Sequence, residues 1–204
     1  ILTELSTAAD ADWESAQGVS FVGLNALLMQ RYMHEYGWQK ADLANFALNA
    51  HANGAGNPKA RFQRAITREQ YEKATMISPP INIMDASPVS DGAAAVVITS
   101  IEAARSVAKQ PIVRIIGSAA ATDSITVHGR KDALWLTAAY DSAKRAYDQA
   151  GISPSDIDFF ELHDAFSIMA TLSLEACGFA ERGKGPRLAI DGGIYPSGRI
   201  PIAT

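Results

Sequence analysis

The stretch that decides how this chain folds is residues 157–167, which read IDFFELHDAFS. Residues 157–162 are mostly apolar and favour a short buried strand, whereas the residues from Asp164 onward favour the first turn of a helix. His163 stands at the junction. An imidazole in that place can form hydrogen bonds, titrate near neutral pH and face a cavity at the carboxyl end of a strand. His163 is therefore a candidate site residue. The alternative is that it is a polar residue whose only role is to cap the helix.

The composition is that of an ordinary globular protein. Of 204 residues, 48% are hydrophobic and 20% are charged, a balance that argues against disorder and against a coiled coil. The 18 basic and 22 acidic side chains give a net charge of -4 without a basic run, which does not favour a nucleic-acid-binding surface. No apolar stretch approaches the ~20 residues of a membrane-spanning helix. The single cysteine, Cys177, excludes an internal disulfide and favours a cytoplasmic location.

Both ends of the sequence suggest a longer protein. Ile1 is neither an initiator methionine nor the charged start of a signal peptide, and Thr204 follows an apolar run without a closing element. We therefore expect these residues to be a piece of a longer chain.

Apolar periodicity predicts three helices in the first third of the chain. The first ends at Gly37 and has an apolar and aromatic face. The residues of that face are Leu24, Leu27, Leu28, Tyr32 and Tyr36. A second helix runs into a loop at 53–58. Thr67 and Gln70 form a capping box for a third helix, which ends near Ala74.

Helices and short strands alternate in the rest of the chain. Further helices are predicted at 101–107, 131–150 and 164–177, and strands at 81–85, 93–99, 112–117, 157–162 and 188–190. This alternation predicts the α/β class, in a layered architecture with mixed sheets and a mainly helical insertion over about 1–75. The best internal boundary lies at 108–111, where a polar link separates two strand-containing parts.

Several motifs, in their order and spacing, resemble those of the thiolases. They lie at residues 21–24, 36–37, 51–58, 90–93, 132–133, 157–166 and 178–185. Thiolases of degradation and biosynthesis typically carry Asn-Glu-Ala-Phe where this chain has His163-Asp164-Ala165-Phe166. The histidine version is similar to that of the sterol-carrier-protein type and of the archaeal acetoacetyl-CoA thiolases.

The resemblance implies a partial thiolase-like layered fold. Residues 1–75 would be the helical loop domain of the first thiolase half, 76–108 the end of that half, and 111–204 the opening part of the second half. It implies homo-oligomers, dimers or tetramers, and the whole protein would be an acetyl-CoA C-acetyltransferase, which catalyses Claisen condensation or thiolysis of 3-oxoacyl-CoA. The nucleophilic cysteine and the base histidine of a Gly-His-Pro motif would lie outside this sequence, so we expect the fragment itself to be inactive.

The resemblance also assigns candidate site residues. His163 matches a position that helps to form an oxyanion hole for the thioester oxygen. His51 and His128 match loop positions near the substrate tunnel, and Lys59 and Arg61 are candidates for the coenzyme A phosphates, because an anion needs cationic neighbours. The coenzyme A thioester would be a substrate, with no tightly bound cofactor. The four histidines show no metal-ligand spacing, and Cys177 is expected to pack as a small hydrophobe.

Two other functions stay open. The chain is similar to thiolase-like subunits that associate with a small zinc-ribbon/OB-fold protein, in aldolase complexes or in the hydroxymethylglutaryl-CoA pathway. His163 argues against the aldolase version, which tends to place tyrosine there. A carrier that binds acyl-CoA or lipid without turnover is the third hypothesis. Acyl chain length and reaction direction do not follow from the sequence.

Overall fold

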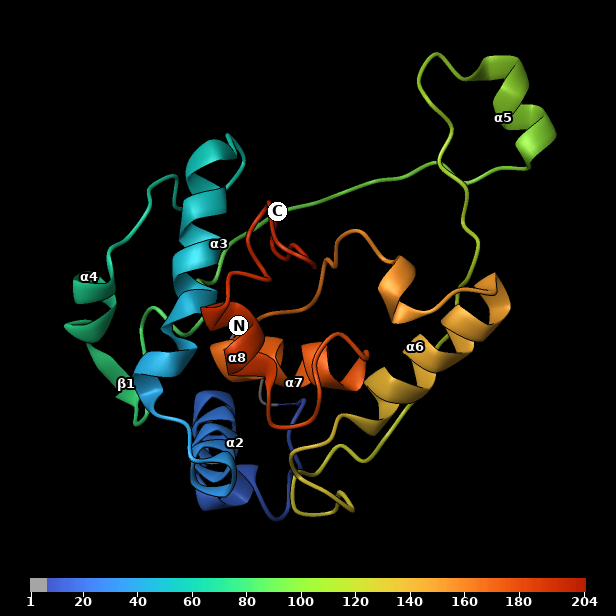
Figure 1. Cartoon of the computed structure of the whole chain (residues 1–204). Coiled ribbons are helices and arrows are strands. Elements are labelled where there is room, and N and C mark those ends of the chain that lie inside the picture. Colours follow the sequence, from blue (N-terminus) through green and yellow to red (C-terminus); the bar gives the residue numbers. More distant parts are fainter. Residues whose placement is uncertain (1–6) are drawn as a thin grey trace.

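The computed structural model describes residues 7–204. Its helices are η1 (Ser15–Gln17), α2 (Phe21–Tyr36), η2 (Lys40–Leu43), α3 (Ala44–Gly56), α4 (Arg68–Glu72), α5 (Ile101–Val107), α6 (Thr137–Ala150), η3 (Pro154–Asp156), α7 (Ser167–Ala176) and α8 (Gly185–Ile190). Helices α2, α3, α7 and α8 gather in one body, and α5 stands away from it at the end of two long extended connections (Figure 1).

Helix α2 confirms the first predicted helix. The Ser20 hydroxyl accepts the N–H of Gly23 at 3.1 Å, and Gly37 ends the helix in the left-handed conformation at φ 74°. Leu27 is a correction, because its side chain is exposed. The buried side chains recur four residues apart, which leaves Leu27 to one side of the inward face.

Helices α3 and α4 follow the predicted pattern with shifted ends. The capping box of Thr67 and Gln70 is confirmed, and the helix it starts ends at Glu72 rather than near Ala74. Helix α3 continues to Gly56, so the loop expected from residue 53 begins later. The amide of Asn53, on this extra turn, donates to the carbonyl of Ile202 at 3.2 Å, which ties α3 to the 200–204 segment.

The regular β-structure of the described residues is a hairpin of β1 (Met76–Ser78) and β2 (Ile81–Asn82), paired antiparallel. The predicted strand 81–85 is wrong beyond Asn82, because the Asn82 side chain accepts the N–H of Asp85 at 3.1 Å and turns the chain. The predicted strands 93–99, 112–117 and 157–162 are also wrong as sheet members. They run without strand pairing, apart from a single bridge between Phe160 and Ile202.

The second half of the chain is more helical than predicted. Residues 188–190 belong to α8, which has Pro186 in its first turn, instead of forming a strand. The helices expected at 131–150 and 164–177 are α6 and α7, and each begins later than predicted. Pro154 stands at the first position of the short helix η3.

The main core joins α2, α7, α8 and the chain after α8. Its fully buried side chains include Met29, Tyr32, Leu43, Ile81, Ile168, Leu174, Ala189 and Ile194. Within it, the Tyr32 hydroxyl donates to Glu175 at 2.5 Å, and the N–H of Gly185 donates to the same carboxylate oxygen at 2.9 Å. One buried carboxylate therefore links three helices. The three domain ranges stay a prediction, although helices from the first and last ranges share this core.

Candidate functional site

His163 lies in an extended stretch that is held on both sides. Upstream, Phe160 pairs in parallel with Ile202. Downstream, Phe166 pairs antiparallel with Ala86, and α7 begins only at Ser167. The sequence predicted helix directly after His163, which is wrong by three residues. The imidazole is exposed within this stretch, between the two bridges, and does not stand at a helix cap.

Asp164, the next residue, turns inward. Burial raises the pKa of its carboxyl, and a hydrogen bond from its own backbone N–H and the charge of His163 oppose that rise. The junction therefore places an exposed imidazole beside a half-buried acid.

Asp164 lines a cavity of about 150 Å³, which we name the inner cavity. Helix α3, the 84–88 segment and the start of α7 form its walls. The lining residues are Phe46, Ala47, Ala50, His51, Met84, Asp85, Ala86, Ser87, Pro88, Asp164, Ser167 and Ala170. Seven of the twelve are apolar, and the five polar ones are His51, Asp85, Ser87, Asp164 and Ser167.

A buried hydrogen-bond network fixes one wall of the inner cavity. The carboxylate of Asp85 accepts hydrogen bonds from the Tyr71 hydroxyl at 2.6 Å, the Ser167 hydroxyl at 2.8 Å and the Asn82 N–H at 3.0 Å. The Ser167 N–H also donates to the carbonyl of Asp85 at 3.0 Å. Burial, and then the adjacent Asp85, raise the pKa of Tyr71. The turn after β2 is thereby locked to the start of α7, four residues after His163 in the chain.

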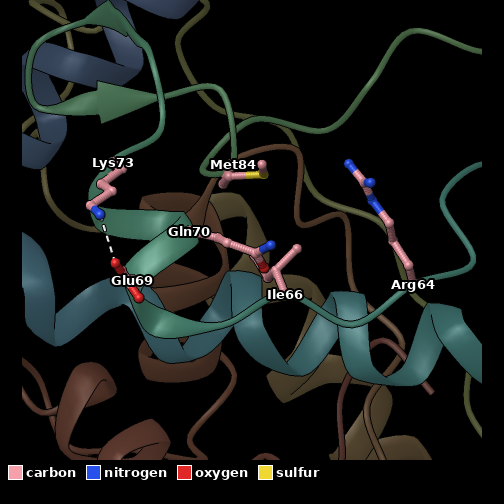
Figure 2. Close-up of a pocket in the computed structure, with 6 residues that line it drawn as sticks. All are labelled: Arg64, Ile66, Glu69, Gln70, Lys73 and Met84. Atoms are coloured by element: carbon pink, nitrogen blue, oxygen red, sulfur yellow. Dashed lines mark hydrogen bonds and ion pairs between the residues drawn. The ribbon is translucent and has the colours of Figure 1, made fainter.

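A second, more open hollow lies next to α4, and we name it the outer pocket. Its volume is about 500 Å³, and it is lined by Arg64, Ile66, Glu69, Gln70, Lys73 and Met84 (Figure 2). Arg64 stands on one side, and Lys73 stands on the other, where its ammonium pairs with Glu69 at 2.6 Å (Figure 2). The outer pocket thus combines the cationic groups of Arg64 and Lys73 with the apolar side chains of Ile66 and Met84.

Met84 lines both hollows, so the outer pocket and the inner cavity are neighbours across one side chain. His51 reinforces this junction. It lines the inner cavity, and its Nδ1 lies 3.3 Å from the carbonyl oxygen of Arg64. Its ring also stacks on Phe62 with a centroid separation of 6.1 Å.

The other predicted coenzyme A residues lie apart from both linings. Lys59 and Arg61 are exposed on the loop that carries Arg64, and the Arg61 guanidinium lies 5.8 Å from the centre of the Phe62 ring. His128 is exposed on a different loop, with its Nδ1 3.5 Å from the carboxylate of Glu14. The structure therefore brings His51 and Asp164 to one cavity. His163 adjoins Asp164 in the chain but is not part of the cavity lining, and Lys59, Arg61 and His128 lie outside that lining as well.

Sequence reasoning did not single out two residues of this region. Arg64 belongs to residues 57–64, whose recurring basic side chains could meet a phosphorylated small molecule, but nothing local distinguishes it from Arg61. Asp85 sits in a segment that was predicted to be a strand, so its burial and its three donors could not be anticipated. The only indication of a turn at Asp85 in the sequence was the polar and turn-forming residues within 81–91.

Two absences hold for the residues that the structure describes. Within 7–204, no group of three or more His, Cys, Asp or Glu side chains is arranged to hold a metal ion. In the same range, no helix has the length and hydropathy needed to cross a membrane.

Comparison with known proteins gives a consistent result. Residues 119–204 match the family described as thiolase C-terminal domain-like. The chain is 39% identical over 198 residues to an acetyl-CoA acetyltransferase of Methanothermobacter thermautotrophicus, covering 97% of this chain and 51% of that protein. It is 36% identical over 188 residues to an acetyl-CoA acetyltransferase of Methanocaldococcus jannaschii, covering 92% of this chain and 48% of that protein.

A solved structure agrees. The chain superposes on the Ltp2-ChsH2(DUF35) aldolase with a TM-score of 0.83 and 29% sequence identity, covering 94% of this chain and 51% of that chain. The chain therefore spans about half the length of the relatives that it matches. The predicted fold class, a partial thiolase-like fold, is confirmed by this superposition and by the family match.

Proposed function

Because this chain belongs to the thiolase superfamily, we propose that the protein it comes from is an acyl-CoA acyltransferase of the acetyl-CoA C-acetyltransferase type. The observation that supports this most strongly is the neighbouring pair of hollows. The outer pocket carries cationic groups, and the lining of the inner cavity includes Asp164, the residue that follows His163.

The shape of acyl-CoA fits that arrangement. Its nucleotide end is a phosphorylated, polyanionic group, and its thioester end sits on a narrow arm that carries two amides. We assign the phosphates to the Arg64 side of the outer pocket, with Lys59 and Arg61 on the same loop as further cations. The arm would pass His51 and Met84 and bring the thioester to His163. His128 stays a weaker candidate, because it lies on another loop.

His163 would act on the thioester oxygen. In the condensation direction, loss of a proton α to the thioester gives an enolate, whose negative charge resides on that oxygen. An imidazole N–H at His163 donates a hydrogen bond to this oxygen and stabilises the charge. The enolate carbon then attacks an acyl-enzyme thioester and releases the thiolate. That thiolate and the base that activates it would be supplied from outside residues 1–204, so we predict that these residues alone do not turn over acyl-CoA.

The test is thiolysis of acetoacetyl-CoA by the whole protein. We expect His163→Ala to lower kcat about 10²–10³-fold, the typical cost of removing one oxyanion donor. The control is His163→Asn, which keeps an N–H donor and should lose less. Wild-type rates in His163→Ala would contradict the assigned role. Binding of acyl-CoA without any turnover by the whole wild-type protein would favour the carrier hypothesis instead.

Binding of coenzyme A to residues 1–204 can be measured separately by calorimetry. We expect Arg64→Ala to weaken binding and the matched control Arg31→Ala to leave it unchanged. Arg31 is an exposed arginine on α2 whose guanidinium pairs with Glu35 at 2.8 Å. Equal affinities for the two variants would remove Arg64 from the proposed site.

A carbon–carbon lyase is the second candidate, and the superposition on an aldolase favours it. The two reactions differ in their need for a thiol. Thiolysis consumes free coenzyme A, whereas retro-aldol cleavage of a 3-hydroxyacyl-CoA proceeds without it. Cleavage by the whole protein in the absence of free coenzyme A would replace the first proposal with the second.

Assembly and location complete the proposal. We infer a cytoplasmic homo-oligomer, which binds a small zinc-ribbon/OB-fold protein if the second candidate holds. Light scattering of the whole protein measures its oligomeric state, and a monomer at micromolar concentration would contradict the proposed homo-oligomer.

A further inference from the structure

Asp85 is a buried acid that reaches the start of α7 from a distant part of the chain. It is 3% exposed, and its partner Ser167 lies 82 residues further along. We propose that Asp85 is a positioning residue, which fixes the start of α7 at Ser167 and thereby holds His163 in the extended stretch. This inference deepens the proposed function and rests on it, since it assigns to Asp85 the placement of the oxyanion donor.

The cap of α7 comes from outside the helix. Phe166, the residue before its first turn, is apolar and makes no side-chain cap hydrogen bond among the described residues. Asp85 supplies the contact instead. Its carbonyl oxygen accepts the Ser167 N–H at 3.0 Å, and its carboxylate accepts the Ser167 hydroxyl at 2.8 Å. A negative charge is favourable there, because the helix dipole is positive at the N-terminus.

The sequence around His163 offers an earlier start for the same helix. Asp164, which follows His163 directly, is an acid of the type favoured at helix N-caps. A helix that began after Asp164 would break the antiparallel bridge that the structure forms between Phe166 and Ala86. The later start keeps this bridge and leaves His163 in extended backbone.

Asp85 is itself held in a fixed position. The carboxylate oxygen that meets Ser167 also accepts the Tyr71 hydroxyl at 2.6 Å, and the other oxygen accepts the Asn82 N–H at 3.0 Å. The Asn82 amide donates in turn to the Tyr71 carbonyl at 2.8 Å, and both residues are fully buried. Such a carboxylate is a rigid anchor, because its release would leave three buried donors without a partner.

The stretch that carries His163 is anchored on both sides. Upstream, the Phe160 N–H donates to the Pro201 carbonyl at 2.8 Å. Downstream, the Ser87 N–H donates to the Ala165 carbonyl at 2.9 Å. Four residues lie between Phe160 and Ala165, His163 among them. A shift of the downstream anchor would move the imidazole relative to the thioester oxygen, and a displacement of about 1 Å can lower a rate about 10²-fold.

Thiolysis of acetoacetyl-CoA by the whole protein tests the proposal. Ser167→Ala removes the hydroxyl that meets Asp85 and should lower kcat about ten-fold, with KM changed less than about two-fold. Asp85→Ala should lower kcat further. The matched control is Thr171→Val, which removes another buried hydroxyl of α7, one that donates to the Ser167 carbonyl at 2.9 Å instead of to Asp85. It should keep the wild-type kcat, and an equal loss in both hydroxyl variants would overturn the proposal.

A double-mutant cycle separates positioning from a general loss of structure. If Asp85 and Ser167 act through His163, Ser167→Ala should cause no further loss of kcat in a protein that already carries His163→Ala. A purely structural defect would lower kcat by the same factor in both backgrounds, and that result would contradict the proposal.

Hydrogen exchange of the whole protein, measured by mass spectrometry, gives a readout that needs no reaction. In Asp85→Ala, the amides of residues 163–167 should exchange about ten-fold faster than in wild type or Thr171→Val, while those of α6 keep their wild-type rates. Unchanged exchange at 163–167, or an equal acceleration in α6, would overturn the positioning role. A wild-type protein that does not cleave acetoacetyl-CoA would instead remove the proposed function, and exchange alone would then decide the role of Asp85.

Discussion

Two exposed apolar segments, residues 93–99 and 112–116, contrast with helix α7, and we name them the bare segments. Helix α7 and the bare segments are built from the same kinds of residues and end in opposite environments. Ile168 and Leu174 of α7 are fully buried, whereas Val97 and Val113 are almost completely exposed. Hydrophobicity does not separate the two regions. The two regions differ in where the hydrogen-bond partners of their backbone N–H and C=O groups lie.

An α-helix satisfies its N–H and C=O groups from within, four residues along the chain. Helix α7 can therefore form from local sequence and then bury its side chains against α2 and α8. A strand satisfies its backbone only through another strand, and that strand can lie far away in the sequence. The difference teaches that α7 finds the surroundings that bury it within residues 7–204, whereas residues 93–99 and 112–116 find no strand to pair with among those residues.

The largest expected effect is a truncation in the core of residues 1–204. Leu174→Ala should lower the free energy of unfolding by about 3 kcal/mol, within the 2–5 kcal/mol range for buried leucines. Val97→Ala should leave it unchanged, because that side chain already lies in water. Urea denaturation of the two variants measures the contrast. Equal losses would mean that the bare segments are packed in solution, and the comparison would fail.

The Asp85 network should have the next largest effect. Asp85→Ala removes the acceptor for the Tyr71 and Ser167 hydroxyls and leaves both donors buried. We expect a loss of about 2 kcal/mol in the free energy of unfolding, since one unsatisfied buried group costs about 1–3 kcal/mol. Asp85→Asn keeps an acceptor oxygen and should lose less. A neutral Asp85→Ala would show that the network does not hold the 85–88 turn to α7.

The sequence predicted the helices far better than the strands, and the reason is physical. Gly37 and Gly151 end α2 and α6 in the left-handed conformation, and Thr67 caps α4, all through contacts within a few residues. The apolar, β-branched runs at 93–99 and 112–117 predicted strands in the same way. Their partners are not among the described residues, so no sheet forms. The strand predicted at 188–190 was wrong for a different reason, because three apolar residues fit a strand and a helix equally well.

The candidate site was predicted in part. His163 followed from its motif, and His51 followed from its loop. His51 lines the inner cavity, and so does Asp164, the residue after His163. Arg64 and Asp85 became visible only in three dimensions. The place of Arg64 depends on how the 57–66 loop folds over α3. The burial of Asp85 depends on its bond to Ser167, which lies 82 residues further along the chain.

A smaller, pH-dependent effect should come from Glu14, which ties the segment before α2 to the 127–128 loop. Its buried carboxylate accepts the N–H of Val127 at 2.7 Å and lies 3.5 Å from His128. Burial alone would raise the pKa of Glu14, but the hydrogen bonds from Asp10 and Val127, followed by His128, bring it below its ordinary value of 4.5.

The sign of that effect follows from linkage. A carboxyl whose pKa is lower in the folded state stabilises the fold above pH 4.5, and the stabilisation is lost as the pH falls below that value. Denaturation of residues 1–204 across this range should show a steeper acid loss for wild type than for Glu14→Gln. Glu35→Gln, on the exposed side of α2, is the control and should keep the wild-type slope. Identical slopes for all three proteins would show that Glu14 does not stabilise the contact between the segment before α2 and the 127–128 loop.

The smallest expected change concerns Cys177, which sits at the end of α7 on the buried side of the comparison. Burial raises the pKa of its thiol to about 11, so at pH 8 the thiolate fraction is on the order of 10⁻³. We expect iodoacetamide to leave the folded chain unlabelled over a time in which it fully labels the urea-unfolded chain, with mass spectrometry as the readout. Val97→Cys supplies an exposed thiol in a bare segment and should react at the rate of the unfolded chain. If Cys177 reacted as fast as that engineered thiol, α7 would not have the closed surroundings that distinguish it from the bare segments.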